Sequence, residues 1–172
     1  MSAAPDYIEP LEAWRVWKVV RVDGAYRLGS VVHGTVWPAG DELRAECLRV
    51  RLFRRRRRRH DAPNVDCECG VYAAGLTQLD LYVAEGLRGP LSRVVGRVAL
   101  WGTVVECERG FRASHAYPAR IYVPHDAGAA WRTSWEDVAL GLCAYRVPVE
   151  PLEAPVAEAP KALAVTALPP AR

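Results

Sequence analysis

The chain has 172 residues, 51% of them hydrophobic and 25% charged, and its formal net charge is +3 at pH 7. This length favours one domain that buries a core without disulfide or metal staples. The longest apolar run, residues 98–105, is far below the roughly 20 residues of a membrane helix, and Met1–Pro5 lacks the pattern of a signal peptide, so we expect a cytoplasmic protein without a membrane partner.

The N-terminal part of the chain has the pattern of successive β-strands. Residues 13–22 are rich in β-branched and aromatic side chains, and they precede Asp23-Gly24, the strongest short hairpin signal. We expect the return strand at about residues 26–36. Residues 43–53 have the length of a third strand, and its arginines at positions 44, 49 and 51 predict that one of its faces is exposed.

A short strand and a helix are predicted next. Residues 69–74 have the apolar pattern of a short buried strand. The stretch Thr77–Asp80 resembles a capping box, and apolar residues at helical spacing follow it. We expect a helix of about ten residues that ends at Gly86.

Two longer strands follow. Residues 94–107 are strongly apolar, and Gly96 and Gly102 within them are typical of bulges or barrel corners. Residues 111–123 form the next predicted strand, with a kink at Pro118.

The C-terminal part contains a second helix signal and then loses its pattern. Ser134–Asp137 is an N-cap signature, and a final strand is expected at residues 144–149. The globular domain is therefore placed at residues 7–150, and the Pro/Ala-rich residues 151–172 are predicted to be a disordered tail. About six strands and two short helices without regular alternation predict a mainly β (α+β) fold, specifically a small mixed β-barrel.

Cysteine and histidine residues cluster in the middle of the chain. Five irregularly spaced cysteines predict reduced thiols rather than a disulfide framework. Cys47, His60, Cys67 and Cys69 could give zinc a Cys₃His ligand set, although their spacing is not a standard zinc pattern. Convergence of the sulfurs and a His60 nitrogen within about 4 Å would favour metal. Otherwise Cys47 is a core residue and His60 belongs to a loop.

A thiol-dependent enzyme is a further hypothesis for the same residues. Cys67 or Cys69 could act as a nucleophile beside His60 or His115, because neighbouring arginines lower the pKa of a thiol. The sequence contains no recognisable third orienting residue and no catalytic signature around these cysteines. We therefore favour a non-catalytic protein and leave enzymatic activity as the alternative.

An unbroken arginine run precedes His60. The candidate contacts to a nucleic acid or another polyanion are Arg49, Arg51, Arg54, Arg55, Arg56, Arg57, Arg58 and Arg59. Without the six consecutive arginines the net charge of +3 becomes −3, so the rest of the chain is not a basic surface. Guanidinium groups bind phosphates bidentately, but blocks of like charge are also typical of solvated loops. Four aromatic residues are either stacking faces for bases or core residues, namely Trp14, Trp17, Tyr72 and Trp101.

A second polar patch is expected near the turn between the two long strands. If the predicted barrel has a mouth, then Glu106, Glu108, His115 and Tyr117 line it. The simpler interpretation is a hairpin tip. Glycine-rich phosphate loops, Ser-centred elbows and Walker motifs are absent from the sequence.

Two stretches carry resemblances to known families. His60-x-x-Pro63 with Cys67-x-Cys69-Gly70-Val71-Tyr72-Ala73, together with the glycine-spaced residues 96–104 and their continuation to Pro118, resembles a family of short, uncharacterised bacterial proteins. That resemblance implies no activity. Residues 96–118 are also similar to PUA-like barrels such as ASCH domains, and this similarity implies a barrel that binds RNA.

The functional hypothesis that follows is a non-catalytic binding module. It associates with a nucleic acid, in particular RNA, or with another polyanion through the arginine-rich segment. The alternative is a zinc-binding or thiol-dependent protein centred on His60, Cys67 and Cys69.

Overall fold

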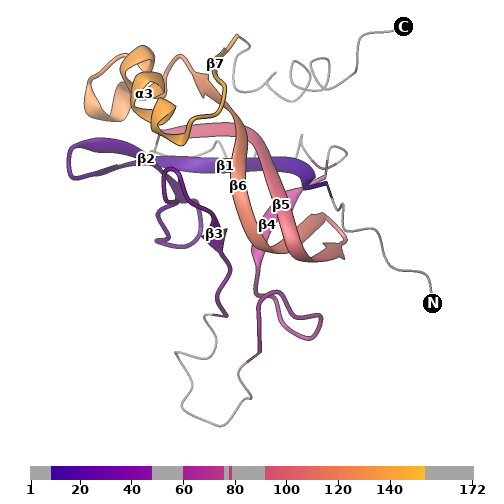
Figure 1. The fold of residues 1–172 in the computed structure, drawn as a ribbon. Helices are drawn as coiled ribbons and strands as arrows, with labels where there is room; N and C mark the ends of the chain where they lie inside the picture. The colour runs from indigo at the N-terminus through magenta and orange to yellow at the C-terminus, as the bar shows by residue number, and fades with distance from the viewer. Residues whose placement is uncertain (1–8, 48–59, 76–77, 79–91, 154–172) are drawn as a thin grey trace, which may run out of the picture.

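A computed structural model describes residues 9–47, 60–75, 78 and 92–153 of the chain (Figure 1). The strands in this part are β1 Leu11–Val22, β2 Ala25–Ser30, β3 Leu43–Arg44, β4 Val71–Ala74, β5 Arg93–Cys107, β6 Gly110–Pro124 and β7 Val149–Leu152. The helical elements are α3 Trp135–Leu142 and two 3₁₀ turns, Ala129–Trp131 and Cys143–Tyr145. The prediction of a mainly β protein is confirmed.

The hairpin of β1 and β2 forms where the sequence predicts it. Asp23 and Gly24 both have positive φ, 50° and 79°, as a type I′ turn requires. The return strand is shorter than expected and ends at Ser30. In place of a strand over residues 31–36, the structure has an isolated bridge between Gly29 and Val36.

The antiparallel pair of β5 and β6, the two longest strands, forms the centre of the sheet. Its register shifts between Arg97 and Val98 and again between Trp101 and Val104, so the bulges lie beside the two glycines that predict them. At Gly96 a Cβ atom would collide with the carbonyl oxygen of Arg120. The glycine is therefore required by close approach of the two backbones.

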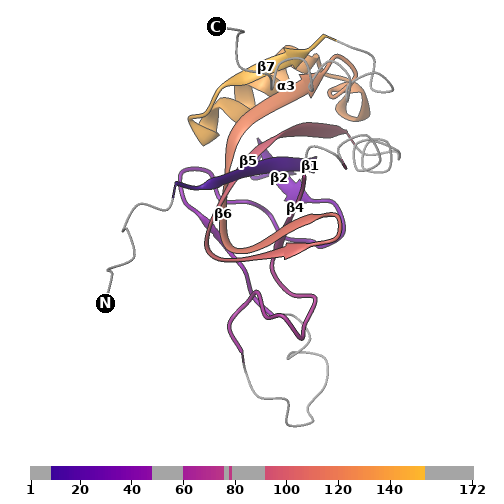
Figure 2. The ribbon, with the colours of Figure 1, turned by 90° about the vertical axis from the view of Figure 1, so that its right-hand side faces the viewer.

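The strands form one seven-stranded sheet, which is not a closed barrel, so the predicted barrel is wrong (Figure 2). β5 pairs with β1 and β6, and β4 also pairs with both of these strands. Among the described residues, β2, β3 and β7 each pair with one neighbouring strand. The short strands β4, β3 and β7 occupy successive parts of one edge of β6. The physical reason for the lack of closure is that β4, the strand between β6 and β1, has four residues and meets β1 at the single pair Trp14–Ala74.

The main core lies between the sheet and α3. Trp17, Trp37 and Tyr145 are its largest fully buried side chains. The Tyr145 hydroxyl accepts a hydrogen bond from the Leu28 amide at 2.9 Å and donates to the Trp37 carbonyl at 2.8 Å. Trp14 is also buried, so Trp14 and Trp17 are core residues rather than stacking faces for bases.

Of the two predicted helices, the described residues contain the second. Ser134 caps α3, and its side chain and that of Asp137 form a capping box. The predicted helix from Thr77 to Gly86 lies outside the described residues except for Gln78. Within the described ranges, no helix is both long and apolar enough to cross a bilayer.

The last strand is displaced from its predicted position. Cys143–Tyr145 is a 3₁₀ turn rather than the start of a strand, and β7 pairs in parallel with β6 from Val149 to Leu152. Leu152 is buried in a second apolar cluster with Trp14 and Tyr122. Residues 151 and 152 therefore belong to the sheet, while residues 154–172 of the predicted tail lie outside the described part.

Candidate metal centre

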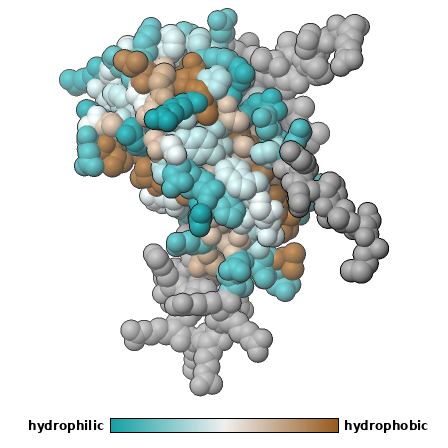
Figure 3. Space-filling model, in the orientation of Figure 1, coloured by the Kyte–Doolittle hydropathy of each residue, from teal (hydrophilic) through white to brown (hydrophobic). Residues whose placement is uncertain are grey.

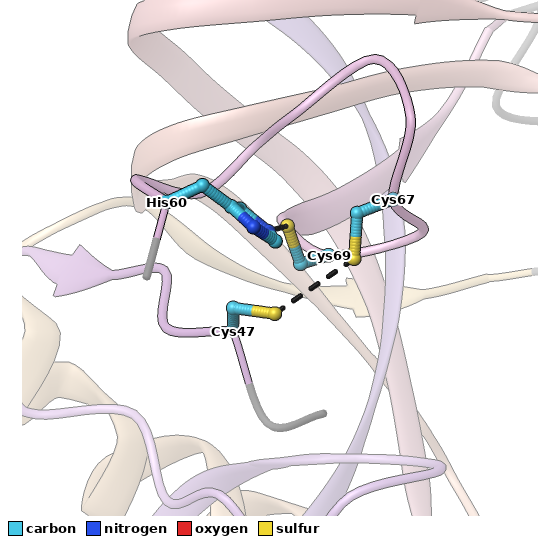
Figure 4. Close-up of side chains that lie close together, drawn as sticks. All are labelled: Cys47, His60, Cys67 and Cys69. Atoms are coloured by element: carbon cyan, nitrogen blue, oxygen red, sulfur yellow. Dashed lines mark hydrogen bonds between the residues drawn. The ribbon is translucent and has the colours of Figure 1, made fainter. Parts of the chain in front are cut away.

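The segments before residue 48 and from residue 60 to β4 lie close together at the end of the molecule opposite α3 (Figures 1 and 2), and they carry four ligand-bearing side chains. One ligand atom from each of Cys47, His60, Cys67 and Cys69 lies within 4.8 Å of all the others. Figure 4 shows these four side chains pointing toward one another. Each residue is partly buried. The structure therefore brings the four predicted residues within metal-binding distance, slightly wider than the 4 Å expected.

Two of the separations between ligand atoms are close to those of a tetrahedral site. With metal–ligand bonds of about 2.0–2.3 Å, a zinc tetrahedron separates two sulfurs by about 3.8 Å and a sulfur from a nitrogen by about 3.6 Å. The Sγ atoms of Cys47 and Cys67 are 3.7 Å apart. His60 Nε2 lies 3.3 Å from Cys69 Sγ. An ion at the centre requires only small movements of the side chains.

Strand β6 is what brings the two halves of the cluster together. The Ala45 amide donates to the Ser114 carbonyl at 2.8 Å, which holds the chain against β6 just before Cys47. The chain returns to the same edge with Val71 opposite Ala113. Because the points of departure and return are adjacent on β6, Cys47 and the stretch 60–69 meet there.

The stretch between His60 and β4 folds into a compact turn. The side-chain oxygen of Asn64 accepts a hydrogen bond from the Asp66 amide at 2.9 Å. The backbone carbonyl of Asn64 accepts another from the Cys67 amide at 3.1 Å. Ala62 and Pro63 are buried beneath this turn. The turn places the sulfurs of Cys67 and Cys69 on the side that faces His60 and Cys47 (Figure 4).

The position after Cys69 requires a glycine, Gly70, for reasons that only the structure shows. Its φ is +129°, and a Cβ there would lie 3.0 Å from Arg112 Cβ and 3.1 Å from Pro63 Cβ. Any other residue would be strained at this φ and crowded by both neighbours. The glycine therefore allows the chain to turn from Cys69 into β4.

The three-thiol environment separates the pKa values of two cysteines. Desolvation raises the pKa of Cys67, but a hydrogen bond from the Cys69 amide, followed by those from Cys47, Cys69 and His60, lowers the pKa overall to about 7. Desolvation raises the pKa of Cys69, and the nearby Cys67 and Cys47 sulfurs raise it further against a hydrogen bond from the Asn64 amide. One thiolate is therefore favoured over two, and a bound cation would relieve this repulsion.

Of the two histidines proposed to activate a nucleophilic cysteine, one, His60, lies beside a cysteine of the cluster. His60 Nε2 is within hydrogen-bond distance of Cys69 Sγ. His115 is not part of the cluster; its Nδ1 lies 2.9 Å from Ser114 Oγ, and its ring stacks on Trp101. A Cys–His pair inside a group of three thiols matches a metal site at least as well as a catalytic dyad.

The remaining predicted site residues separate into two groups. Arg49, Arg51 and Arg54–Arg59 lie outside the described residues, so the polyanion hypothesis stays a prediction. The second polar patch has no barrel mouth to line. Tyr117 instead accepts from the Gly40 amide and donates to the Tyr145 carbonyl, while Glu106 and Glu108 are exposed near the β5–β6 turn.

Comparisons with protein-family models, curated proteins and solved structures give no match to the chain. The resemblances to a bacterial family and to PUA-like barrels therefore stay predictions from the sequence motifs.

Proposed function

We propose that this protein binds one zinc ion through Cys47, His60, Cys67 and Cys69. The observation that carries the proposal is the meeting of four ligand atoms within 4.8 Å. Thiolates and imidazole form a soft ligand set that suits zinc, and Cys₃His is an established structural combination. All five cysteines are free thiols, which suits the reducing, cytoplasmic setting that we also propose.

The proposed role of the zinc is structural. Four side chains complete a tetrahedron and leave no open position for water or substrate, whereas catalytic zinc keeps one. The ion would connect the chain after β3 to the turn before β4, two stretches that backbone pairing holds only at their outer ends. We therefore propose a metal-stabilised binding module and not a zinc enzyme.

Elemental analysis of purified protein tests the zinc proposal directly. We expect about one zinc per chain in the unmodified protein and a loss of most of it in Cys69→Ser. The matched control is Cys143→Ser, because Cys143 is exposed at the end of α3 and does not belong to the cluster. Less than about 0.2 zinc per unmodified chain, or equal zinc in all three proteins, would contradict the proposal.

A second candidate function is association with RNA or another polyanion through Arg54–Arg59, with Arg49 and Arg51 extending the patch. The observation that favours it is the position of Cys47 and His60, which flank the arginine-rich segment and lie together in the cluster. Both ends of that segment therefore start from one place on the molecule. A zinc ion at the cluster would keep these two ends together.

Salt dependence of binding to single-stranded RNA and to duplex DNA tests this second candidate. If all six consecutive arginines contact phosphates of B-DNA, log K falls with log salt at a slope of about −5. Replacing Arg54–Arg59 by Gly and Ser should abolish binding and leave the zinc content unchanged. Binding that survives this replacement, or no binding at about 50 mM salt, would refute the candidate and leave the zinc proposal intact.

A further inference from the structure

Arg112 is a buried cation on β6 beside the candidate metal centre, with 7% of its surface exposed. Its Nη1 donates to the backbone carbonyls of Asn64 and Cys69, at 3.3 and 3.1 Å, and to that of Cys67. Its Nε donates to Cys107 Sγ at 3.1 Å. A buried guanidinium is costly unless its donors are satisfied, and here the turn supplies the acceptors.

Tyr72 completes this set of contacts from the neighbouring strand. It lies directly opposite Arg112 in the β4–β6 register, and the Arg112 Cζ is 6.0 Å from its ring. The Tyr72 hydroxyl donates to the Glu68 carbonyl at 2.6 Å. The carbonyls of three consecutive residues, Cys67 to Cys69, are thus all bound by side chains from β4 and β6.

These contacts replace the strand pairing that the turn does not have. The ladder between β4 and β6 begins at Val71, after the two cysteines. Hydrogen bonds to the carbonyls of Cys67 and Cys69 fix the backbone positions of both ligands relative to β6. Their sulfurs are then left free to face His60 and Cys47.

The positive charge of Arg112 also suits the net charge of the proposed zinc centre with its ligands. Zn²⁺ with three thiolates and a neutral imidazole carries a net charge of about −1. A guanidinium bound to the backbone of two of the ligands offsets this charge without competing for the sulfurs that coordinate the metal. Partners of this kind outside the ligand set typically change metal affinity by on the order of 10- to 100-fold.

We infer that Arg112 is a positioning residue that holds Cys67 and Cys69 in their ligating arrangement, with Tyr72 as its auxiliary. The inference rests on the proposed zinc site. The hydrogen bonds from Arg112 and Tyr72 to the carbonyls of Cys67, Glu68 and Cys69 would then fix the position of the turn relative to the sheet. The inference also explains why a charged side chain is buried at a strand position that an apolar residue would otherwise fill.

The test compares Arg112→Lys with Arg120→Lys in the full-length protein. Lysine keeps the charge but lacks the planar fork that reaches the turn carbonyls and Cys107 together. Arg120 is the matched control because it lies on the same strand and pairs with Glu150 at a partly exposed position. Zinc affinity, measured by competition with a chromogenic chelator, should fall about 10- to 100-fold for Arg112→Lys and stay within about twofold for Arg120→Lys.

Two further measurements separate positioning from general stability. Cobalt(II) substituted into the site reports ligand geometry, and its visible absorption bands should change in Arg112→Lys but not in Arg120→Lys. Tyr72→Phe, which removes only the bond to the Glu68 carbonyl, is a milder variant that should weaken zinc binding less than Arg112→Lys. It keeps the test informative if Arg112→Lys does not fold.

The outcomes distinguish the inference from the proposal beneath it. If the unmodified protein binds no zinc, the proposed function fails. If it binds zinc but Arg112→Lys and Tyr72→Phe both match it in affinity and cobalt spectrum, only the positioning inference fails. Weaker binding with altered cobalt bands supports both.

Discussion

At the scale of single residues, the cluster favours the thiolate form of Cys67 over that of Cys69. The pKa of Cys67 is lowered to about 7, chiefly because hydrogen bonds to its sulfur outweigh desolvation, whereas the pKa of Cys69 is raised by burial and by its sulfur neighbours. Thiolate is the form that binds metal, so the lowered pKa of Cys67 would favour binding of the proposed zinc ion. Residue type alone cannot reveal this difference, because it depends on which amide points at which sulfur.

The pH dependence of alkylation checks the difference in the metal-free protein. The thiolate fraction of Cys67, and with it the rate of its reaction with iodoacetamide, should rise through pH of about 7, as the lowered pKa requires. In the urea-unfolded chain the same rise should occur near the ordinary value of about 8.5. Peptide mapping by mass spectrometry follows Cys67 separately from the other cysteines.

The sign of the linked stability follows from the same shift. Because the folded state lowers this pKa, ionisation of Cys67 stabilises the metal-free fold fully above the unfolded pKa, and the contribution is lost as the pH falls through about 7. Zinc-loaded protein should be protected from alkylation. Equal midpoints for Cys67 in the folded and unfolded chains would contradict the described hydrogen bonding.

At the scale of elements, β6 organises both the sheet and the site. Its one edge pairs with β5 over nearly its whole length, and its other edge receives β4, β3 and β7 in turn. The glycines of β5 permit this arrangement, because its register shifts lie beside them. The sequence predicts these bulges correctly, since a glycine inside an apolar strand is a local signal.

Gly96→Ala should therefore destabilise the sheet strongly for so small a change. The new methyl group would collide with the backbone carbonyl of Arg120, which cannot rotate away as a side chain could. We expect the free energy of unfolding in urea to fall by about 1–3 kcal/mol. Gly34→Ala is the matched control, because its Cβ would meet nothing within 4 Å, and its effect should stay below about 1 kcal/mol. Equal stabilities of the two variants would argue against the described β5–β6 register.

At the scale of the whole molecule, the candidate metal centre lies at the border of the core. The main apolar cluster extends from α3 through β1, β2, β5 and β6 to Val71 and Ala73 of β4, while the candidate ligands lie between β3 and β4 in the chain. On the face shown in Figure 3, described hydrophilic and hydrophobic residues alternate in small groups. Broad apolar patches mark docking surfaces, and the mixed character of the described residues on this face does not indicate one there.

Zinc removal should consequently unfold the site but not the sheet. A chain of this size buries enough surface to fold without metal, unlike a small zinc finger. After chelation we expect faster hydrogen exchange in peptides covering residues 60–70 and unchanged exchange in peptides covering β5. Mass spectrometry measures both in one experiment, with re-added zinc as the control. Loss of protection throughout β1 and β5 would show instead that the metal supports the entire fold.

The residue pattern by itself determined the features that depend on near neighbours in the chain. The Asp23-Gly24 hairpin, the Ser134 cap of α3 and the glycine bulges of β5 are set by backbone conformations that only certain residues adopt. The four candidate ligands were also predictable, because thiols and imidazoles are chemically distinctive wherever they fold.

Only the tertiary structure decided how distant segments combine. It determined the open sheet in place of a barrel, the pairing of β7 with β6, and the meeting of Cys47 with His60 and the later cysteines. It also placed Arg112 against the turn that carries Cys67 and Cys69. The physical reason is that these contacts arise from the register of strands far apart in the chain, and register depends on the packing of the whole sheet rather than on local preference.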